Sequence, residues 1–159
     1  MKTIKRHHLT MIFALLTAAA IHAADHIELS PGDEAYSAEH FEEAARLYRK
    51  EAELGIGAAQ INLAFMYLDG IGIAQSYQEA AHWFLKAAEQ DNAEAQQNLG
   101  VLYQQGKLGT ANSVEADKWF RLAKSGKDLL SIEKTMTPAQ ISEAGKLADA
   151  WLAQFKTRR

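Results

Sequence analysis

The chain has no cysteine among its 159 residues. Without disulfides, its stability must come from packing alone. The same absence removes any site for lipid attachment to an N-terminal cysteine. Long hydrophobic runs are also missing, because the mainly apolar stretch from Leu9 to Ile21 has only 13 residues and is too short to span a bilayer.

Signatures of catalysis are missing too. The chain contains no Gly-x-Ser-x-Gly elbow, phosphate loop, nucleotide fingerprint or paired-carboxylate motif. His26, His40 and His82 are scattered, and none has a second ligand at metal spacing. We therefore expect neither enzyme activity nor a cofactor.

The charge balance excludes further partners. The net charge is −3, and without the first 23 residues 14 basic and 20 acidic residues give −6. A negative protein is a poor ligand for nucleic acid or anionic lipid, so neither is expected as the main partner.

The first 23 residues have the layout of a cleavable signal peptide. Basic residues from Lys2 to Arg6 precede the apolar run, and small residues follow it. We expect cleavage after Ala23, with Ala20 or Ala24 as alternative sites; a retained anchor or a buried first helix is the competing interpretation. The layout predicts a periplasmic protein with no stable membrane anchor after cleavage.

Cleavage after Ala23 would place Ala24, Asp25 and His26 at the new N-terminus. A free amine, two amide nitrogens and a histidine in third place can form a square-planar site for Cu(II) or Ni(II). Chance also explains a histidine there, so no metal is expected and this binding stays an alternative.

What the chain does contain is a repeat of 36 residues. Gln60-Ile61-Asn62-Leu63 returns as Gln96-Gln97-Asn98-Leu99, and Trp83-Phe84 returns as Trp119-Phe120. A fixed period of about 20 to 50 residues is typical of stacked-repeat proteins, which are mostly interaction scaffolds. Helical spacing of apolar residues and glycine loops predict two helices in each unit, and no convincing strand pattern occurs. We expect an all-α fold.

Capping signals predict where helices begin. Ser76, Asp91 and Asn112 each precede a glutamate by three residues, as in a capping box. Thr137 before Pro138 predicts a closing helix that runs to about residue 155. Its apolar face is expected to contain Ile141, Ala144, Leu147, Ala148, Trp151, Leu152 and Phe155.

The repeated residues resemble Sel1-like repeats. The resemblance rests on residues 59–67 and 95–103, each with a leucine and then a tyrosine, on glycines 70, 72 and 106, and on residues 80–88 and 116–120. It implies a right-handed superhelix, or solenoid, of antiparallel helix pairs with a C-terminal capping helix. It also implies a scaffold or adaptor role and brings no catalytic residue with it.

These signals divide the chain into four parts. We expect a signal peptide over 1–23 and an N-terminal linker over 24–36, with a turn from Leu29 to Asp33. One half and two full Sel1-like units follow over 37–126. Closing helices and a basic tail occupy 127–159.

The partner-binding surface is predicted on the first helix of each pair, because these helices line the concave face of such arrays. The candidates are non-repeating positions in two stripes: Ile61, Phe65 and Leu68, and their counterparts Gln97, Val101 and Gln104. The first stripe is either a groove for an apolar side chain or a surface buried against the preceding helix, near Phe41 and Tyr48.

The sequence also predicts where three further side chains lie: Trp83, Trp119 and Lys118. The two tryptophans recur at the packing period and are expected in the core, whereas Lys118 is expected on the outer face.

The function indicated is that of an exported scaffold or adaptor that binds a protein or peptide. Two alternatives remain open: a regulator that docks on a periplasmic enzyme such as a cell-wall hydrolase, and a copper- or nickel-binding protein.

Overall fold

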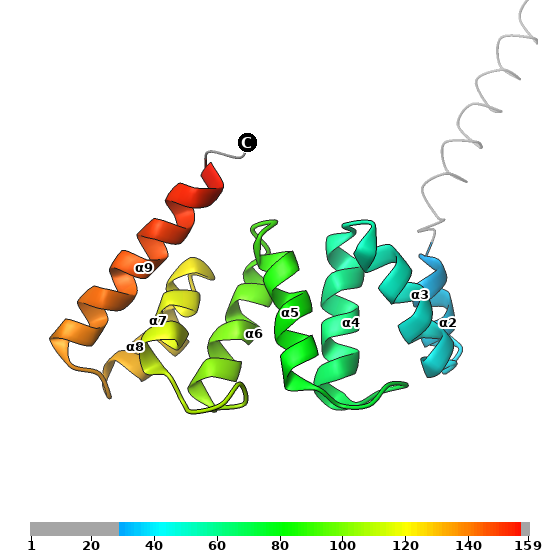
Figure 1. The fold of residues 1–159 in the computed structure, drawn as a ribbon, viewed down its shortest axis with the longest axis horizontal. Coiled ribbons are helices and arrows are strands. Elements are labelled where there is room, and N and C mark those ends of the chain that lie inside the picture. The colour runs from blue at the N-terminus through cyan, green and yellow to red at the C-terminus, as the bar shows by residue number, and fades with distance from the viewer. Residues whose placement is uncertain (1–28, 157–159) are drawn as a thin grey trace, which may run out of the picture. The chain divides into compact units, whose positions relative to one another are not determined.

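The computed structural model describes residues 29–156, and this part of the chain forms eight α-helices and no strand. Figure 1 shows the helices following one another in a row. Their bounds are α2 Pro31–Ser37, α3 Phe41–Glu53, α4 Gly57–Asp69, α5 Tyr77–Ala88, α6 Ala93–Gln104, α7 Ser113–Leu122, α8 Gly126–Glu133 and α9 Pro138–Lys156.

Each helix from α2 to α7 packs on the next one along the chain, and α9 returns to pack on α7 (Figure 1). The main core cluster runs from α3 to α9, and its largest fully buried side chains include Phe84, Leu63 and Met66. No helix in the described part is both long and apolar enough to cross a membrane. The all-α solenoid expected from the repeat is confirmed.

Three of the predicted caps are confirmed. The side-chain oxygens of Ser76 and Asn112 accept hydrogen bonds from the backbone N–H three residues on, at 3.2 and 3.0 Å. The Thr137 hydroxyl accepts one from the Gln140 N–H at 3.3 Å, and the Gln140 side chain accepts one from the Thr137 N–H at 2.9 Å. These bonds satisfy donors that the first turn of a helix leaves unpaired. At the other end of α4, Gly70 takes the left-handed cap with φ 72°.

The fourth cap, at Asp91, is wrong by one residue. Asn92 caps α6, and its side chain accepts a hydrogen bond from the Ala95 N–H at 2.9 Å. Asp91 instead has a left-handed backbone with φ 65°, as does its counterpart Gly55 with φ 85°. The short link between the two helices needs this reversal, so the cap falls one residue later.

The linker predicted over 24–36 is wrong at residues 31–36, and the turn predicted from Leu29 to Asp33 is wrong at residues 31–33, because α2 begins at Pro31. Proline suits the first position of a helix, where its missing N–H costs nothing. Asp33 and Glu34 add negative charge to the first turn, where the helix dipole favours it. The two residues interpreted as a turn signal are therefore a helix start.

A pair of buried glutamines explains one of the repeated positions. The Gln60 side-chain amide donates to the Ala52 carbonyl of α3 at 3.1 Å, and the Gln96 amide donates to the Ala88 carbonyl of α5 at 3.5 Å. Both glutamines are buried. Each carbonyl also accepts a backbone N–H, from Gly55 and Asp91 respectively, so the glutamine adds a second bond there and ties one repeat unit to the next.

The closing helix buries a narrower face than expected. Ala144 and Ala148 are buried, and the Trp151 ring meets that of Trp119 in α7 with 4.8 Å between centroids. Leu147 and Leu152, predicted on the same face, are exposed. A single helix resting on one neighbour covers only a stripe along its length, and these two leucines lie outside it.

The two repeated tryptophans differ, and Lys118 is not on a free outer face. Trp119 is 3 % exposed, as expected for the core, whereas Trp83 is half-buried against the main core cluster. Lys118 pairs with Glu115 at 2.5 Å and lies 4.5 Å from the centre of the Trp119 ring. The expectation for Lys118 is therefore wrong, because its side chain covers the aromatic contact between α7 and α9.

Candidate functional site

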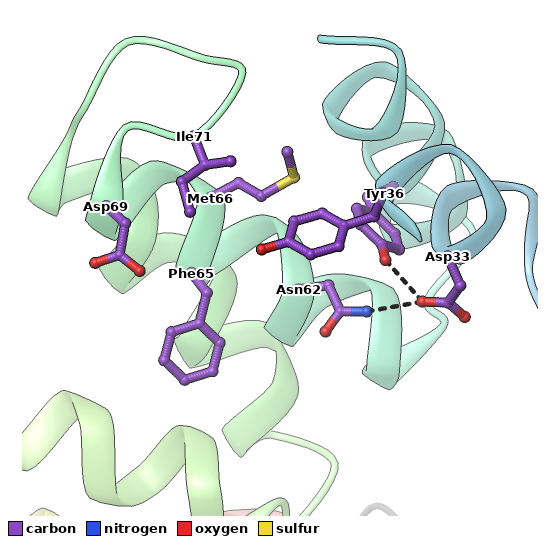
Figure 2. Close-up of a pocket in the computed structure, with 8 residues that line it drawn as sticks. Asp33, Tyr36, Asn62, Phe65, Met66, Asp69 and Ile71 are labelled. Carbon is purple, nitrogen blue, oxygen red and sulfur yellow. Dashed lines mark hydrogen bonds between the residues drawn. The ribbon is translucent and has the colours of Figure 1, made fainter. Parts of the chain in front are cut away.

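A pocket of about 440 Å³ opens between the N-terminal helices. Figure 2 shows its lining residues, which come from α2, α3, α4 and the start of the following loop. They are Asp33, Tyr36, Tyr48, Asn62, Phe65, Met66, Asp69 and Ile71. Small-molecule and side-chain sites in proteins have volumes of about 300 to 1,000 Å³ and combine apolar walls with a few polar groups, as here. We call this site the α2–α4 pocket.

Hydrogen bonds hold one wall of the α2–α4 pocket in place. The Tyr48 hydroxyl and the Asn62 amide both donate to the same oxygen of Asp33, at 2.7 and 3.2 Å (Figure 2). Three helices are joined at this one carboxylate. Burial, and then the hydrogen bond to Asp33, raise the pKa of the Tyr48 hydroxyl above its usual range, so the hydroxyl stays a donor in alkaline as well as in neutral solution.

A glycine allows α2 to come this close. A Cβ atom added at Gly32 would lie 2.4 Å from the Tyr48 ring, well inside contact distance. The Gly32 N–H also donates to a side-chain oxygen of Glu51 in α3 at 3.1 Å. The close approach at Gly32 thus brings the next residue, Asp33, to Tyr48 and Asn62.

The opposite end of the α2–α4 pocket carries a second carboxylate. Asp69 is the exposed last residue of α4, and Figure 2 shows it on the far side of Phe65 and Tyr36 from Asp33. A negative charge at a helix C-terminus is opposed by the helix dipole, by about 0.3–1 kcal/mol. The last turn of α4 contains no basic residue, and none of the ion pairs found in residues 29–156 involves Asp69. Packing does not explain this charge.

The structure separates the three residues of the first predicted stripe. Ile61 is 8 % exposed and belongs to the core, so it offers no surface to a partner. Leu68 is half-buried against the same core. Phe65 alone lines the α2–α4 pocket, and its ring also meets that of Phe84 in α5 edge-on, with 5.2 Å between centroids.

The second stripe lies away from the α2–α4 pocket. The exposed Gln97 side chain donates to Asp128 at 2.7 Å, which ties α6 to α8. Val101 is half-buried against the small cluster of Ala116, Phe120 and Ile132. Gln104 is exposed at the end of α6. The two stripes therefore do not form one continuous apolar groove.

Sequence reasoning missed most of the α2–α4 pocket. Asp33 and Tyr36 were assigned to a linker, and Asn62 was noted only as a repeated residue. Its counterpart Asn98 donates within its own helix to the Glu94 carbonyl at 2.9 Å, so repetition gave no hint of the bond to Asp33. The available signal was the proline and the two acids at 31–34, which are typical of a helix start.

The other residues predicted for a site lie elsewhere. Ala24, Asp25 and His26, the signal peptide and its cleavage site lie outside the described residues. Within residues 29–156, no group of three histidine, cysteine, aspartate or glutamate side chains is placed to hold a metal ion.

The geometry of residues 29–156 is that of a helical-repeat solenoid with a pocket among its N-terminal helices. Comparison with known proteins identifies the repeat. The Sel1 repeat family model matches residues 57–92 and 93–128, so the chain contains two Sel1 repeats.

Solved structures show the same fold. A protective antigen of uropathogenic Escherichia coli strains, described as displaying an SLR fold, is 32 % identical with a TM-score of 0.67 over 72 % of this chain and 26 % of the antigen. A Sel1 repeat protein from Oxalobacter formigenes is 36 % identical with a TM-score of 0.57 over 64 % of this chain and 43 % of that protein. The chain thus spans less than half the length of either. No curated protein matches it at a significant level.

Proposed function

We propose that this chain is an exported interaction scaffold that binds a segment of a partner protein in the α2–α4 pocket. Sel1 repeat proteins generally act in protein–protein interaction, and their fold is typically a non-catalytic scaffold. Three points go beyond this general role: the binding site is the α2–α4 pocket, the protein is exported, and the ligand is a segment of a partner protein.

The observation that carries the proposal is that the lining of the α2–α4 pocket departs from the repeat. Asp69 corresponds to Gln105 in the next unit, Phe65 to Val101, and Ile71 to Lys107. The repeat fold forms in both units, so it does not require a carboxylate, a large ring and an aliphatic side chain at these positions. Residues that packing does not dictate are the ones free to be selected for binding.

Export is supported by the basic start and the short apolar run of the first 23 residues. It places the partner in the periplasm or at a surface facing it. A scaffold and a regulator both remain compatible with this location, and they differ in whether the turnover of a bound enzyme changes.

Affinity capture from periplasmic extract tests the proposal. The wild-type protein is compared with Phe65→Ala and with the matched control Val101→Ala, which truncates the corresponding residue of the next unit. We expect Phe65→Ala to retain at least ten-fold less partner than the wild type, and Val101→Ala to retain as much as the wild type. Equal retention by all three proteins would contradict binding at the α2–α4 pocket.

A further inference from the structure

We infer that the α2–α4 pocket recognises a long cationic side chain, with arginine preferred, in an exposed segment of the partner. The inference rests on the proposed function and specifies its ligand. It comes from the charge, the aromatic wall and the rigidity of the α2–α4 pocket.

The charge of the α2–α4 pocket is negative throughout. Its eight lining residues include Asp33 and Asp69 and no lysine, arginine or histidine. Arg49 of α3 does not line the pocket, and its guanidinium donates to the Tyr67 hydroxyl at 2.5 Å. An incoming cation would therefore meet the carboxylate of Asp69, which belongs to none of the ion pairs found in residues 29–156, and charge-assisted hydrogen bonds to carboxylates are strong.

The surrounding chain has the same sign. Residues 31–106 contain twelve acidic and four basic side chains, whereas residues 107–159 contain six acidic and ten basic ones. The α2–α4 pocket lies in the acidic part. This distribution attracts a basic segment toward the N-terminal helices and away from the C-terminal ones.

The walls suit a side chain with an apolar stem. Tyr36 is 39 % exposed, and its ring borders the α2–α4 pocket together with Phe65, Met66 and Ile71 (Figure 2). A cation gains energy over the face of an aromatic ring, and the methylene groups of arginine pack on apolar surface. An aliphatic ligand would match the walls but would gain nothing from the charges of Asp33 and Asp69.

Arginine is preferred over lysine because of its shape. Its planar guanidinium both stacks on aromatic rings and presents paired donors to a carboxylate, whereas the lysine ammonium is a compact, strongly hydrated charge. Asp33 is held by Tyr48 and Asn62 at 2.7 and 3.2 Å, so one acceptor is already oriented. Asp69, on the far side, is the second.

The test is a titration of the purified protein, as recovered from expressing cells, with short peptides. Two-dimensional NMR spectra of the backbone amides report binding at each step of the titration. The probes are four acetylated and amidated pentapeptides that differ only in the central residue of an alanine background: arginine, lysine, citrulline and leucine. Citrulline keeps the shape of arginine and removes its charge. We expect the arginine peptide to shift amides of α2, α4 and residues 70–73, and to bind at least ten-fold more tightly than the citrulline peptide.

Charge variants complete the test. Asp69→Asn should weaken the arginine peptide by at least three-fold and leave the leucine peptide unchanged. Glu89→Gln removes one negative charge from an exposed position at the end of α5 and should change neither by more than two-fold. Because Asp69 makes no ion pair in the described part of the chain, its substitution is expected to leave the fold intact, and the amide spectrum itself verifies this.

Three outcomes would overturn the inference: equal binding of the arginine and citrulline peptides, tighter binding of the leucine peptide, or shifts confined to other acidic surfaces. None of these outcomes contradicts the proposed function if Phe65→Ala also retains less partner than the wild type in the affinity capture. Conversely, a selective arginine site with no Phe65-dependent capture would contradict the proposed function alone.

Discussion

At the scale of single residues, the repeat positions divide into those that maintain the array and those that do not. Gln60 and Gln96 are alike in sequence because both satisfy a carbonyl of the preceding helix while buried. Gln60 makes one bond more, since its side-chain oxygen accepts from Gln90 at 2.8 Å. Asp69, by contrast, belongs to none of the ion pairs found in residues 29–156, and we therefore consider it a candidate for binding.

We expect Gln60→Ala to lower the free energy of unfolding by about 1–3 kcal/mol, because it removes a buried side chain together with its hydrogen bonds to the Ala52 carbonyl and from the Gln90 amide. Urea unfolding followed by circular dichroism measures the change. Gln78→Ala, at an exposed position of α5, is the control and should shift stability by less than about 0.5 kcal/mol. A Gln60→Ala protein as stable as the control would show that the Gln60 hydrogen bonds between units contribute nothing to the free energy of unfolding.

The two tryptophans should respond differently to truncation. Trp119→Ala removes a buried ring that packs on Trp151, and such changes cost about 3–5 kcal/mol. Trp83→Ala should cost less, because Trp83 is half-buried. Denaturant unfolding of both variants decides the order, and a larger loss at Trp83 would mean that the packing described for α7 and α9 is wrong.

At the scale of elements, the sequence predicted the repeat helices and the closing helix well and the N-terminal end of the array poorly. The closing helix, confirmed at Pro138–Lys156, is marked by a strong local capping signal. α2 was missed because the pair Pro31-Gly32 is common in turns, and the reason for Gly32 is a contact with Tyr48, sixteen residues away. Local patterns do not record such a contact.

The same limit explains why the α2–α4 pocket was found only in part. Phe65 stood out because it breaks the repeat, whereas Asp33 and Tyr36 lie in a helix that has no repeated counterpart. Ile61 follows the same helical spacing as Phe65 but faces the core. Spacing alone gives a stripe on a helix and does not show which neighbour covers it.

We expect Gly32→Ala to loosen α2 without unfolding the repeats, because the added methyl group would meet the Tyr48 ring at 2.4 Å. Hydrogen exchange of residues 31–37 should accelerate at least ten-fold, while exchange in α4 to α6 stays near the wild-type rate. Gly145→Ala is the matched control, since it adds a methyl group in the middle of α9 with nothing within 4 Å. Unchanged exchange in α2 would contradict the close packing of α2 on Tyr48.

At the scale of the whole molecule, the account joins two Sel1 repeats to an acidic pocket at one end and an aromatic closing contact at the other. The array supplies a rigid support, because each helix is held by its neighbours along the row. The α2–α4 pocket is placed by α2, α3 and α4, and the remaining helices contribute charge and stability. The function proposed for the molecule therefore depends on its N-terminal third.

Export is a prediction about the whole chain. We expect the protein isolated from the periplasm to begin at Ala24 or within a few residues of it, because the basic start and short apolar run are typical of a cleaved leader. Intact-mass spectrometry measures the N-terminus directly. An intact chain starting at Met1 in that fraction would contradict cleavage.

The central claim is that the α2–α4 pocket binds the partner, and its most direct test is the dissociation constant of the captured partner measured by calorimetry. Phe65→Ala and Tyr36→Ser each alter one wall, and circular dichroism verifies that both variants fold. The account predicts at least ten-fold weaker binding for both and less than two-fold change for Val101→Ala. Folded Phe65→Ala and Tyr36→Ser proteins that bind as tightly as the wild type would contradict it.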